Sequence, residues 1–107
     1  MLLGEMIHNS SSTSVYTAPI SRGGKTGMFS IDVTQLESTA TLAIEIQHKN
    51  QADTTWTSKE AFTTATTTGM NTKQADDVEE QVRLKFDVTG GAAAWVRVQI
   101  LPISWTN

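Results

Sequence analysis

Four segments of the chain alternate apolar and polar residues, and this alternation constrains the fold more than any other feature of the sequence. It is found in residues 28–36, 41–48, 81–88 and 95–100. A period of two is typical of a strand with one buried face, because successive side chains point to opposite sides. The apolar positions of these segments predict a core: Phe29, Ile31, Val33, Leu42, Ile44, Ile46, Val82, Leu84, Phe86, Val96, Val98 and Ile100.

The composition also favours strands. The 107 residues include 17 Thr and 9 Ser, whereas charged residues make up only 18%, and the β-branched Thr side chain suits a pleated sheet. No connection contains a helical pattern long enough for a parallel crossover. We therefore expect an all-β fold, an antiparallel β-sandwich or a jelly-roll-like barrel, as one domain over residues 15–107.

Other segments are less regular. A further strand is expected to begin at Trp56 and to run to about Thr64, which would give five or six strands in all. Residues 63–72 are so rich in Thr that they predict either a twisted edge strand or a long exposed loop. Residues 76–81 could form one helical turn, because acidic residues suit a helix N-terminus.

The N-terminal residues are expected to form an arm. Five of the first seven residues are apolar, and a Ser-rich stretch over residues 9–14 then predicts a polar hinge. Residues 1–14 are therefore assigned to an arm and hinge outside the domain. Its apolar side chains Leu2, Leu3, Met6 and Ile7 are candidates for binding a partner, since an isolated monomer would expose them.

Charge and hydropathy exclude several kinds of partner. The formal net charge of -3 leaves no basic surface for nucleic acid. Apolar runs shorter than ten residues predict no membrane-spanning helix. The N-terminal segment carries Glu5 and no Lys or Arg, so no secretory signal peptide is expected.

No group of residues identifies a reaction, so we expect a protein that is not an enzyme and that has no cofactor or metal. His8 and His48 are expected to be solvated and have no metal-site spacing. The acidic residues 76–80 lack the glycine and residue order of a calcium loop, which favours a solvated acidic loop. The run Gly23-Gly24-Lys25-Thr26 lacks the spaced first glycine of a phosphate loop.

Asp53 is expected to cap its own turn by accepting backbone N–H bonds, with Trp56 packed nearby.

The three tryptophans have two interpretations. Trp56, Trp95 and Trp105 either lie in the core or at a subunit contact, or offer a stacking platform to a sugar. Core or subunit contact is the favoured interpretation.

Several segments resemble small structural proteins of tailed bacteriophages. The resemblance is carried by residues 42–49, 53–57, 82–86 and 95–98: a strand that ends near Gln, a turn, a Thr-Trp strand start and a late Val-Arg-Val strand. It covers about residues 29–100 and rests on short patterns. Members of that group decorate capsids or build tails and head fibres, so the resemblance implies a virion part made in the host cytoplasm.

Two functions remain open. The first is a capsid decoration or cement protein at the capsid surface, which self-associates, most simply as a homotrimer, and binds neighbouring major capsid protein subunits. The second is a carbohydrate-binding module of a phage fibre or tail, with Trp56 or Trp105 against a glycan. The residues expected to contact partners are Leu2, Leu3, Met6, Ile7, Trp56 and Trp105.

Overall fold

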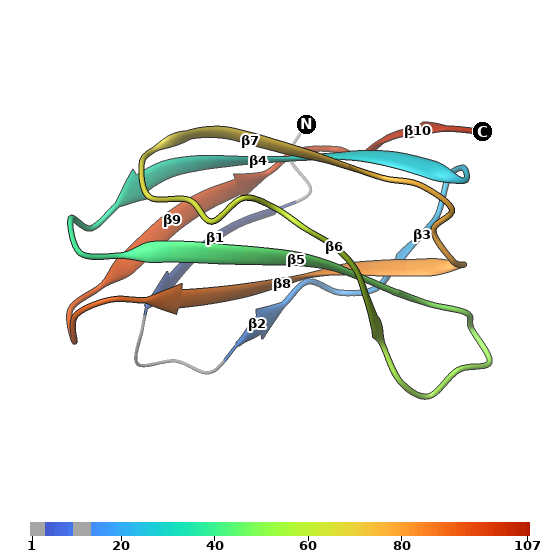
Figure 1. Ribbon diagram of the computed structural model, residues 1–107, viewed down its shortest axis with the longest axis horizontal. Coiled ribbons are helices and arrows are strands. Elements are labelled where there is room, and N and C mark those ends of the chain that lie inside the picture. The colour runs from blue at the N-terminus through green and yellow to red at the C-terminus, as the bar shows by residue number, and fades with distance from the viewer. Residues whose placement is uncertain (1–3, 10–13) are drawn as a thin grey trace.

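The computed structural model describes residues 4–9 and 14–107, and within them the chain forms ten strands and no helix. The strands are β1 (Gly4–Asn9), β2 (Val15–Tyr16), β3 (Ile20–Ser21), β4 (Thr26–Leu36), β5 (Thr41–Lys49), β6 (Thr57–Ala61), β7 (Gly69–Ala75), β8 (Gln81–Thr89), β9 (Trp95–Ile100) and β10 (Ser104–Thr106). Two antiparallel sheets pack face to face (Figure 1). The predicted all-β class is confirmed, and the architecture is the sandwich.

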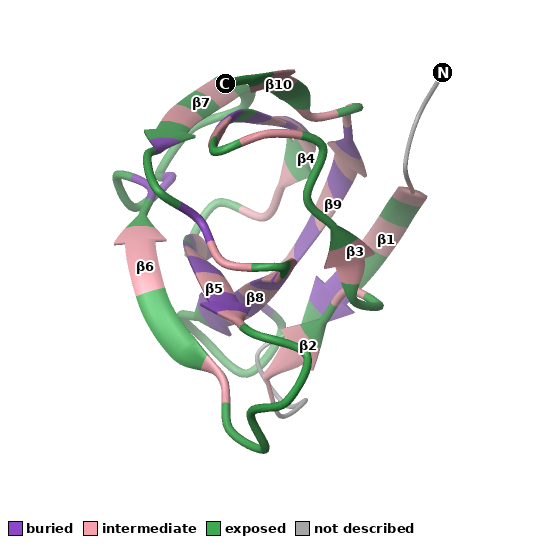
Figure 2. Cartoon of the chain, turned by 90° about the vertical axis from the view of Figure 1, so that its right-hand side faces the viewer, coloured by how far each residue is buried: buried purple, intermediate pink, exposed green. Residues whose placement is uncertain are grey.

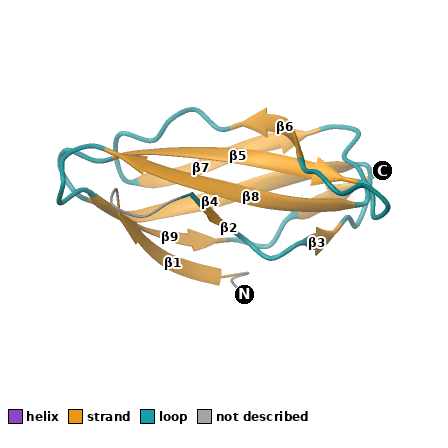
Figure 3. Ribbon diagram, turned by 90° about the horizontal axis from the view of Figure 1, so that it is seen from below, coloured by secondary structure: helices purple, strands orange, loops and turns teal. Residues whose placement is uncertain are grey.

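Each sheet contains five strands of the described chain. In the first, sheet A, β9 and β10 pair with successive parts of β4 along one edge, and β7 pairs along the other. β1 pairs with β9 and lies at the margin of this sheet (Figure 3). In the second, sheet B, β5 and β8 pair along their full lengths, β6 flanks β5, and the short β2 and β3 flank β8.

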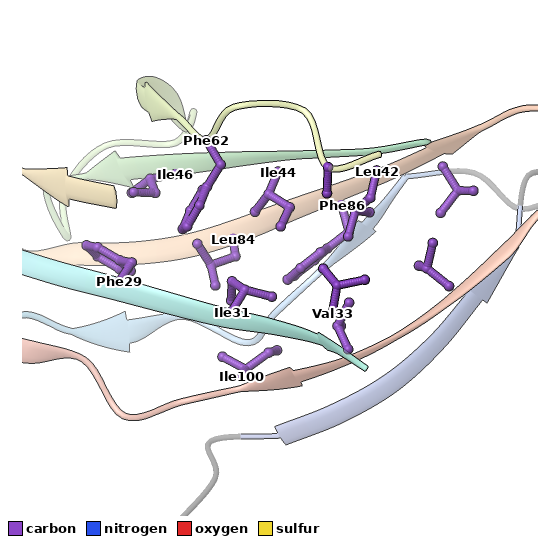
Figure 4. Packing of buried hydrophobic residues seen from close by; sticks show 14 of the residues in the cluster. Phe29, Ile31, Val33, Leu42, Ile44, Ile46, Phe62, Leu84, Phe86 and Ile100 are labelled. Atoms are coloured by element: carbon purple, nitrogen blue, oxygen red, sulfur yellow. The ribbon is translucent and has the colours of Figure 1, made fainter. Parts of the chain in front are cut away.

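The core lies between the two sheets and consists of the inward positions of the alternating strands (Figure 4). All twelve predicted core residues are buried, and the side chains of Ile31, Leu42, Ile46, Val82, Phe86 and Val98 have no exposed surface. An antiparallel sheet buries one face and leaves the other wet, so the two-residue period located these positions correctly. Buried residues outside the predicted set include Phe62, Ala75 and Val78.

At one end of the sandwich the β4–β5 connection packs against the β8–β9 connection. The carboxylate of Glu37 accepts hydrogen bonds from the backbone N–H (3.0 Å) and the hydroxyl (2.6 Å) of Thr39. The hydroxyl of Thr39 holds the pKa of Glu37 below its ordinary value. Gly90 has φ = 142°, and a Cβ there would overlap the carbonyl oxygen of Thr39. Only glycine fits this close approach.

The N-terminal segment requires a correction. The expected arm over residues 1–14 is wrong for residues 4–9, because they form β1 and pair with β9 from Gly4↔Ile100 to Asn9↔Trp95. Leu2 and Leu3, and the hinge residues 10–13, lie outside the described residues. The edge of β9 supplies backbone hydrogen-bonding partners, which bring β1 into the sheet. The domain boundary at residue 15 therefore does not separate β1 from the fold.

Three other expectations differ in detail. Residues 76–80 form a loop and not a helical turn, with Asp77 at φ = 54°. The Thr-rich segment is divided, because Ala65 makes a single bridge to Leu42 and β7 begins at Gly69. The described residues contain more strands than the five or six predicted, because β1 and the short strands β2, β3 and β10 were not expected.

Candidate functional site

The outer edge of β1 is the candidate functional site. β1 is six residues long, and among the described strands it pairs only with β9. Ile7, near its middle, is 70% exposed, the largest exposure among the described large apolar side chains. Figure 2 shows β1 at the outer margin of its sheet, with no other labelled strand along its free edge. Such an edge presents backbone groups that can pair with another strand.

The single carboxylate of β1 is turned towards its own sheet. Glu5 Oε1 accepts a hydrogen bond from Arg97 Nη2 at 2.9 Å, and Glu5 Oε2 accepts one from Gln99 Nε2 at 3.0 Å. The hydrogen bond from Gln99, followed by that from Arg97, lowers the pKa of Glu5. The negative charge of Glu5 is thus paired on the face of sheet A and does not protect the edge of β1 from pairing with another strand.

The other strands at sheet margins in the described chain are short or guarded. β2 and β3 have two residues each and are separated by a segment that contains Pro19, which cannot donate a backbone hydrogen bond. β6 and β7 lie on the same side of the sandwich, where Lys73 Nζ is 3.7 Å from Glu60 Oε1. Lysine and proline protect sheet edges from pairing. β1 carries neither.

A second group of side chains lies on the outer face of sheet B. The guanidinium of Arg83 is 4.1 Å from the ring centroid of Tyr16 and 4.5 Å from that of Trp56. Its Nε donates to Gln47 Oε1 at 2.7 Å, and Lys49 Nζ lies 5.4 Å from the Trp56 ring. Cation–π attraction therefore holds Trp56 against the sheet. The sequence pointed to Trp56 but not to Arg83, because their contact joins distant parts of the chain.

The turn before Trp56 has the predicted cap. Asp53 Oδ2 accepts the backbone N–H of Asn50 at 3.1 Å, and Asp53 donates its own backbone N–H to the Asn50 carbonyl at 2.9 Å. Lys49 Nζ donates to the carbonyl of Asp53 at 2.9 Å. Lys49 therefore links the capped turn to the ring of Trp56.

Trp105 has the surroundings of a core residue, which was the first interpretation of the tryptophans. Its ring lies edge-on to Phe29, with centroids 5.9 Å apart and planes at 75°. A Cβ at Gly23 would lie 2.7 Å from the indole, and one at Gly27 would lie 3.0 Å from it. These two glycines leave the room that the indole occupies. Trp105 thus fixes the C-terminal strand β10 to β4.

The two histidines are buried, which corrects the expectation that they are solvated. His8 is 4% exposed on the inward side of β1, and His48 is 9% exposed near the end of β5. The backbone N–H of Glu79 donates to His48 Nδ1 at 3.0 Å, and His48 Nε2 lies 3.3 Å from Glu79 Oε1. The paired group is 31 positions away in the sequence, so spacing gave no signal of it.

The acidic loop over residues 76–80 is solvated at Asp76, Asp77 and Glu80, as expected, and it also contacts the turn after β5. Glu79 accepts a hydrogen bond from Asn50 Nδ2 at 2.5 Å, and Glu80 accepts one from the backbone N–H of Gln51 at 3.0 Å. Val78, which directly precedes these two residues, is 1% exposed, and its carbonyl accepts a hydrogen bond from Arg22 Nη1 at 2.7 Å. In the part of the chain that the structure describes, no cluster of His, Cys, Asp and Glu is arranged to hold a metal ion.

A small hollow opens between the two sheets on the side of β1. It has a volume of about 140 Å³ and is lined by Thr17, Ala18, Pro19, Ile20 and Ile100. Its one hydroxyl, on Thr17, accepts the backbone N–H of Leu84 at 3.0 Å. Apart from Thr17, the side chains of the lining are apolar. None of the described residues lies in a helix long and apolar enough to cross a membrane.

Comparison with known proteins finds no matching family, no matching curated protein and no matching solved structure.

Proposed function

We propose that the protein is a structural component of a virion: a capsid decoration protein that joins copies of itself and binds major capsid protein subunits at the shell surface. The free edge of β1 carries the proposal, because strand addition at such an edge is a direct way for β proteins to join a neighbour. The resemblance of residues 42–49, 53–57, 82–86 and 95–98 to phage structural proteins supports the same role. The homotrimer expected from the sequence stays a prediction.

The carbohydrate-binding alternative has no comparable support. Stacking against a sugar needs an open aromatic face. Arg83 and Lys49 already lie near the ring of Trp56, and Trp105 is packed against Phe29 and two glycines. The structural role is therefore the one we propose.

The test is the copy number of the chain in virus particles. Particles would be purified from cells in which the chain is produced during infection, and the chain would be quantified by mass spectrometry against the major capsid protein. We expect a copy number that scales with the shell, in the range of hundreds per particle. Absence from the particles, or only a few copies in each, contradicts the decoration role.

A further inference from the structure

We propose that β1 pairs antiparallel with β1 of a second copy of this chain, about a two-fold axis that passes beside Ile7. The inference rests on the proposed function, because it names the surface through which copies join. It would unite the two A sheets into one continuous sheet, with the two B sheets on the same side of it.

The differences among the sheet margins indicate which strand pairs with the free edge of β1. The side with β6 and β7 carries lysines and a salt bridge, and the side with β2 and β3 is broken by Pro19. β1 of a second copy is therefore the complementary edge that this molecule itself offers: a strand of equal length with neither Lys nor Pro. Each edge satisfies the backbone groups of the other.

The side chains of β1 select the register. Directly opposed residues in a sheet lie on the same face, and Glu5, Ile7 and Asn9 share the outer face of β1 whereas Met6 and His8 share the inner one. With Ile7 on the axis, Ile7 faces its own copy and Glu5 faces Asn9. Two apolar side chains then meet at the centre, and no like charges are opposed.

Moving the axis by one residue in either direction keeps the two faces matched but is less favourable. With His8 on the axis, Ile7 of each copy would face the polar Asn9 of the other. With Met6 on the axis, Glu5 of each copy would face Ile7 of the other, so that a carboxylate would lie against the most exposed apolar side chain. The carboxylate is already bound to Arg97 and Gln99 and gains nothing from that position. The Ile7-centred register covers Ile7 with an apolar partner.

The two-fold arrangement also closes the assembly. Both free edges are used in the pair, and the guarded margins do not extend it into a filament. A homotrimer would need two different surfaces on each copy, and this single edge supplies one. The mass of the assembly in solution therefore distinguishes the pair from the trimer expected from the sequence.

The first test is a site-specific cross-link, for which the cysteine-free chain is well suited. In the proposed register, the Cβ atoms at position 7 of the two copies lie about 4.5–5.5 Å apart, a separation from which a small shift allows a disulfide. We expect oxidised Ile7→Cys to double its mass on a non-reducing gel. Met70→Cys is the matched control, because Met70 is 56% exposed on the opposite margin of sheet A.

The outcomes are separable. Linking of Ile7→Cys alone supports the pair, whereas failure of Ile7→Cys to link, or equal linking of both variants, overturns it. The second test measures mass by light scattering as concentration rises. We expect the parent and Met70→Lys to approach twice the chain mass and Ile7→Lys to remain at the single-chain mass. A parent that reaches three chain masses, or stays single at the highest concentration, also overturns the pair.

The inference and the proposed function can fail independently. If the cross-link forms but the chain is absent from particles, the pairing stands and the decoration role fails. If the chain is abundant in particles and Ile7→Cys does not link there either, the decoration role stands and the pairing fails. Circular dichroism and the thermal midpoint of each variant check that the fold is retained, as expected for changes at exposed side chains.

Discussion

The Nδ1 atom of His48 accepts a hydrogen bond from the backbone N–H of Glu79, 3.0 Å away, and so ties the end of β5 to the loop before β8. A ring nitrogen that accepts an N–H bond carries no proton, so the proton of the neutral imidazole is on Nε2, 3.3 Å from Glu79 Oε1. One buried side chain thereby partners both the backbone and the carboxylate of the same residue.

Replacement of His48 by phenylalanine is expected to lower the free energy of unfolding by about 1–3 kcal/mol, because it leaves the Glu79 N–H without its acceptor. His48→Asn is the control, since its side-chain oxygen can take the place of Nδ1 and should recover part of the loss. Urea unfolding measures both, and amide exchange at Glu79 should accelerate in the phenylalanine variant. Equal stability of His48→Phe and the parent contradicts the role of the bond.

The core register is tested at Phe86, which has no exposed surface. Phe86→Ala removes a large buried side chain and is expected to cost about 3–5 kcal/mol of unfolding free energy, a large share of the stability of a domain of this size. Met28→Ala, at a side chain that is 36% exposed, should cost much less. A thermal midpoint of Phe86→Ala within a degree or two of the parent value contradicts the assigned packing.

The bonds of Glu5 predict a pH dependence at β1. Its folded-state pKa lies below the ordinary value of 4.5, because Gln99 and Arg97 bind the ionised form. The stabilisation is therefore fully present above about pH 4.5 and is lost as the pH falls through the lower folded-state pKa. The stability difference between the parent and Glu5→Gln should be present at neutral pH and should disappear in acid. A difference that is unchanged between neutral and acid pH contradicts the assignment.

The stack on sheet B predicts energetic coupling between Tyr16 and Arg83. A double-mutant cycle with Tyr16→Ala and Arg83→Ala is expected to give an interaction energy of about 0.5–1 kcal/mol, typical of an exposed cation–π pair. A parallel cycle between Tyr16 and Lys73, which lies on β7 of the other sheet, should give additive effects. Additivity in both cycles shows that the contact between Tyr16 and Arg83 contributes nothing to stability.

Alanine substitutions at two glycines with positive φ allow the energetic cost of backbone strain to be compared with that of a steric clash. A Cβ added to Gly69 (φ 137°) would have no atom within 4 Å, whereas a Cβ added to Gly90 (φ 142°) would overlap the Thr39 carbonyl oxygen. Alanine at position 69 should cost about 1–3 kcal/mol from strain alone. Alanine at position 90 should cost more, as measured by denaturant unfolding. Equal costs show that the turn of Thr39 moves aside freely.

The core of the sandwich could be predicted from local pattern. Each long strand carries its own two-residue period. The inward positions of β4, β5, β8 and β9 could therefore be predicted from the sequence without knowing which strands lie beside them. The capped turn at Asp53 was readable for the same reason, because an Asx side chain acts on backbone only a few residues away.

Features that depend on distant partners became visible only in the folded chain. Strands of two or three residues show no period, and β1 is a strand because the edge of β9, near the other end of the sequence, accepts it. His48 continues the inward positions of β5, but its partner Glu79 comes from a distant loop, and Arg83 stacks because the sheet brings Tyr16 and Trp56 close to it. Local pattern fixes which face of a strand is buried, but pairing and burial of polar groups depend on which segments the fold brings together.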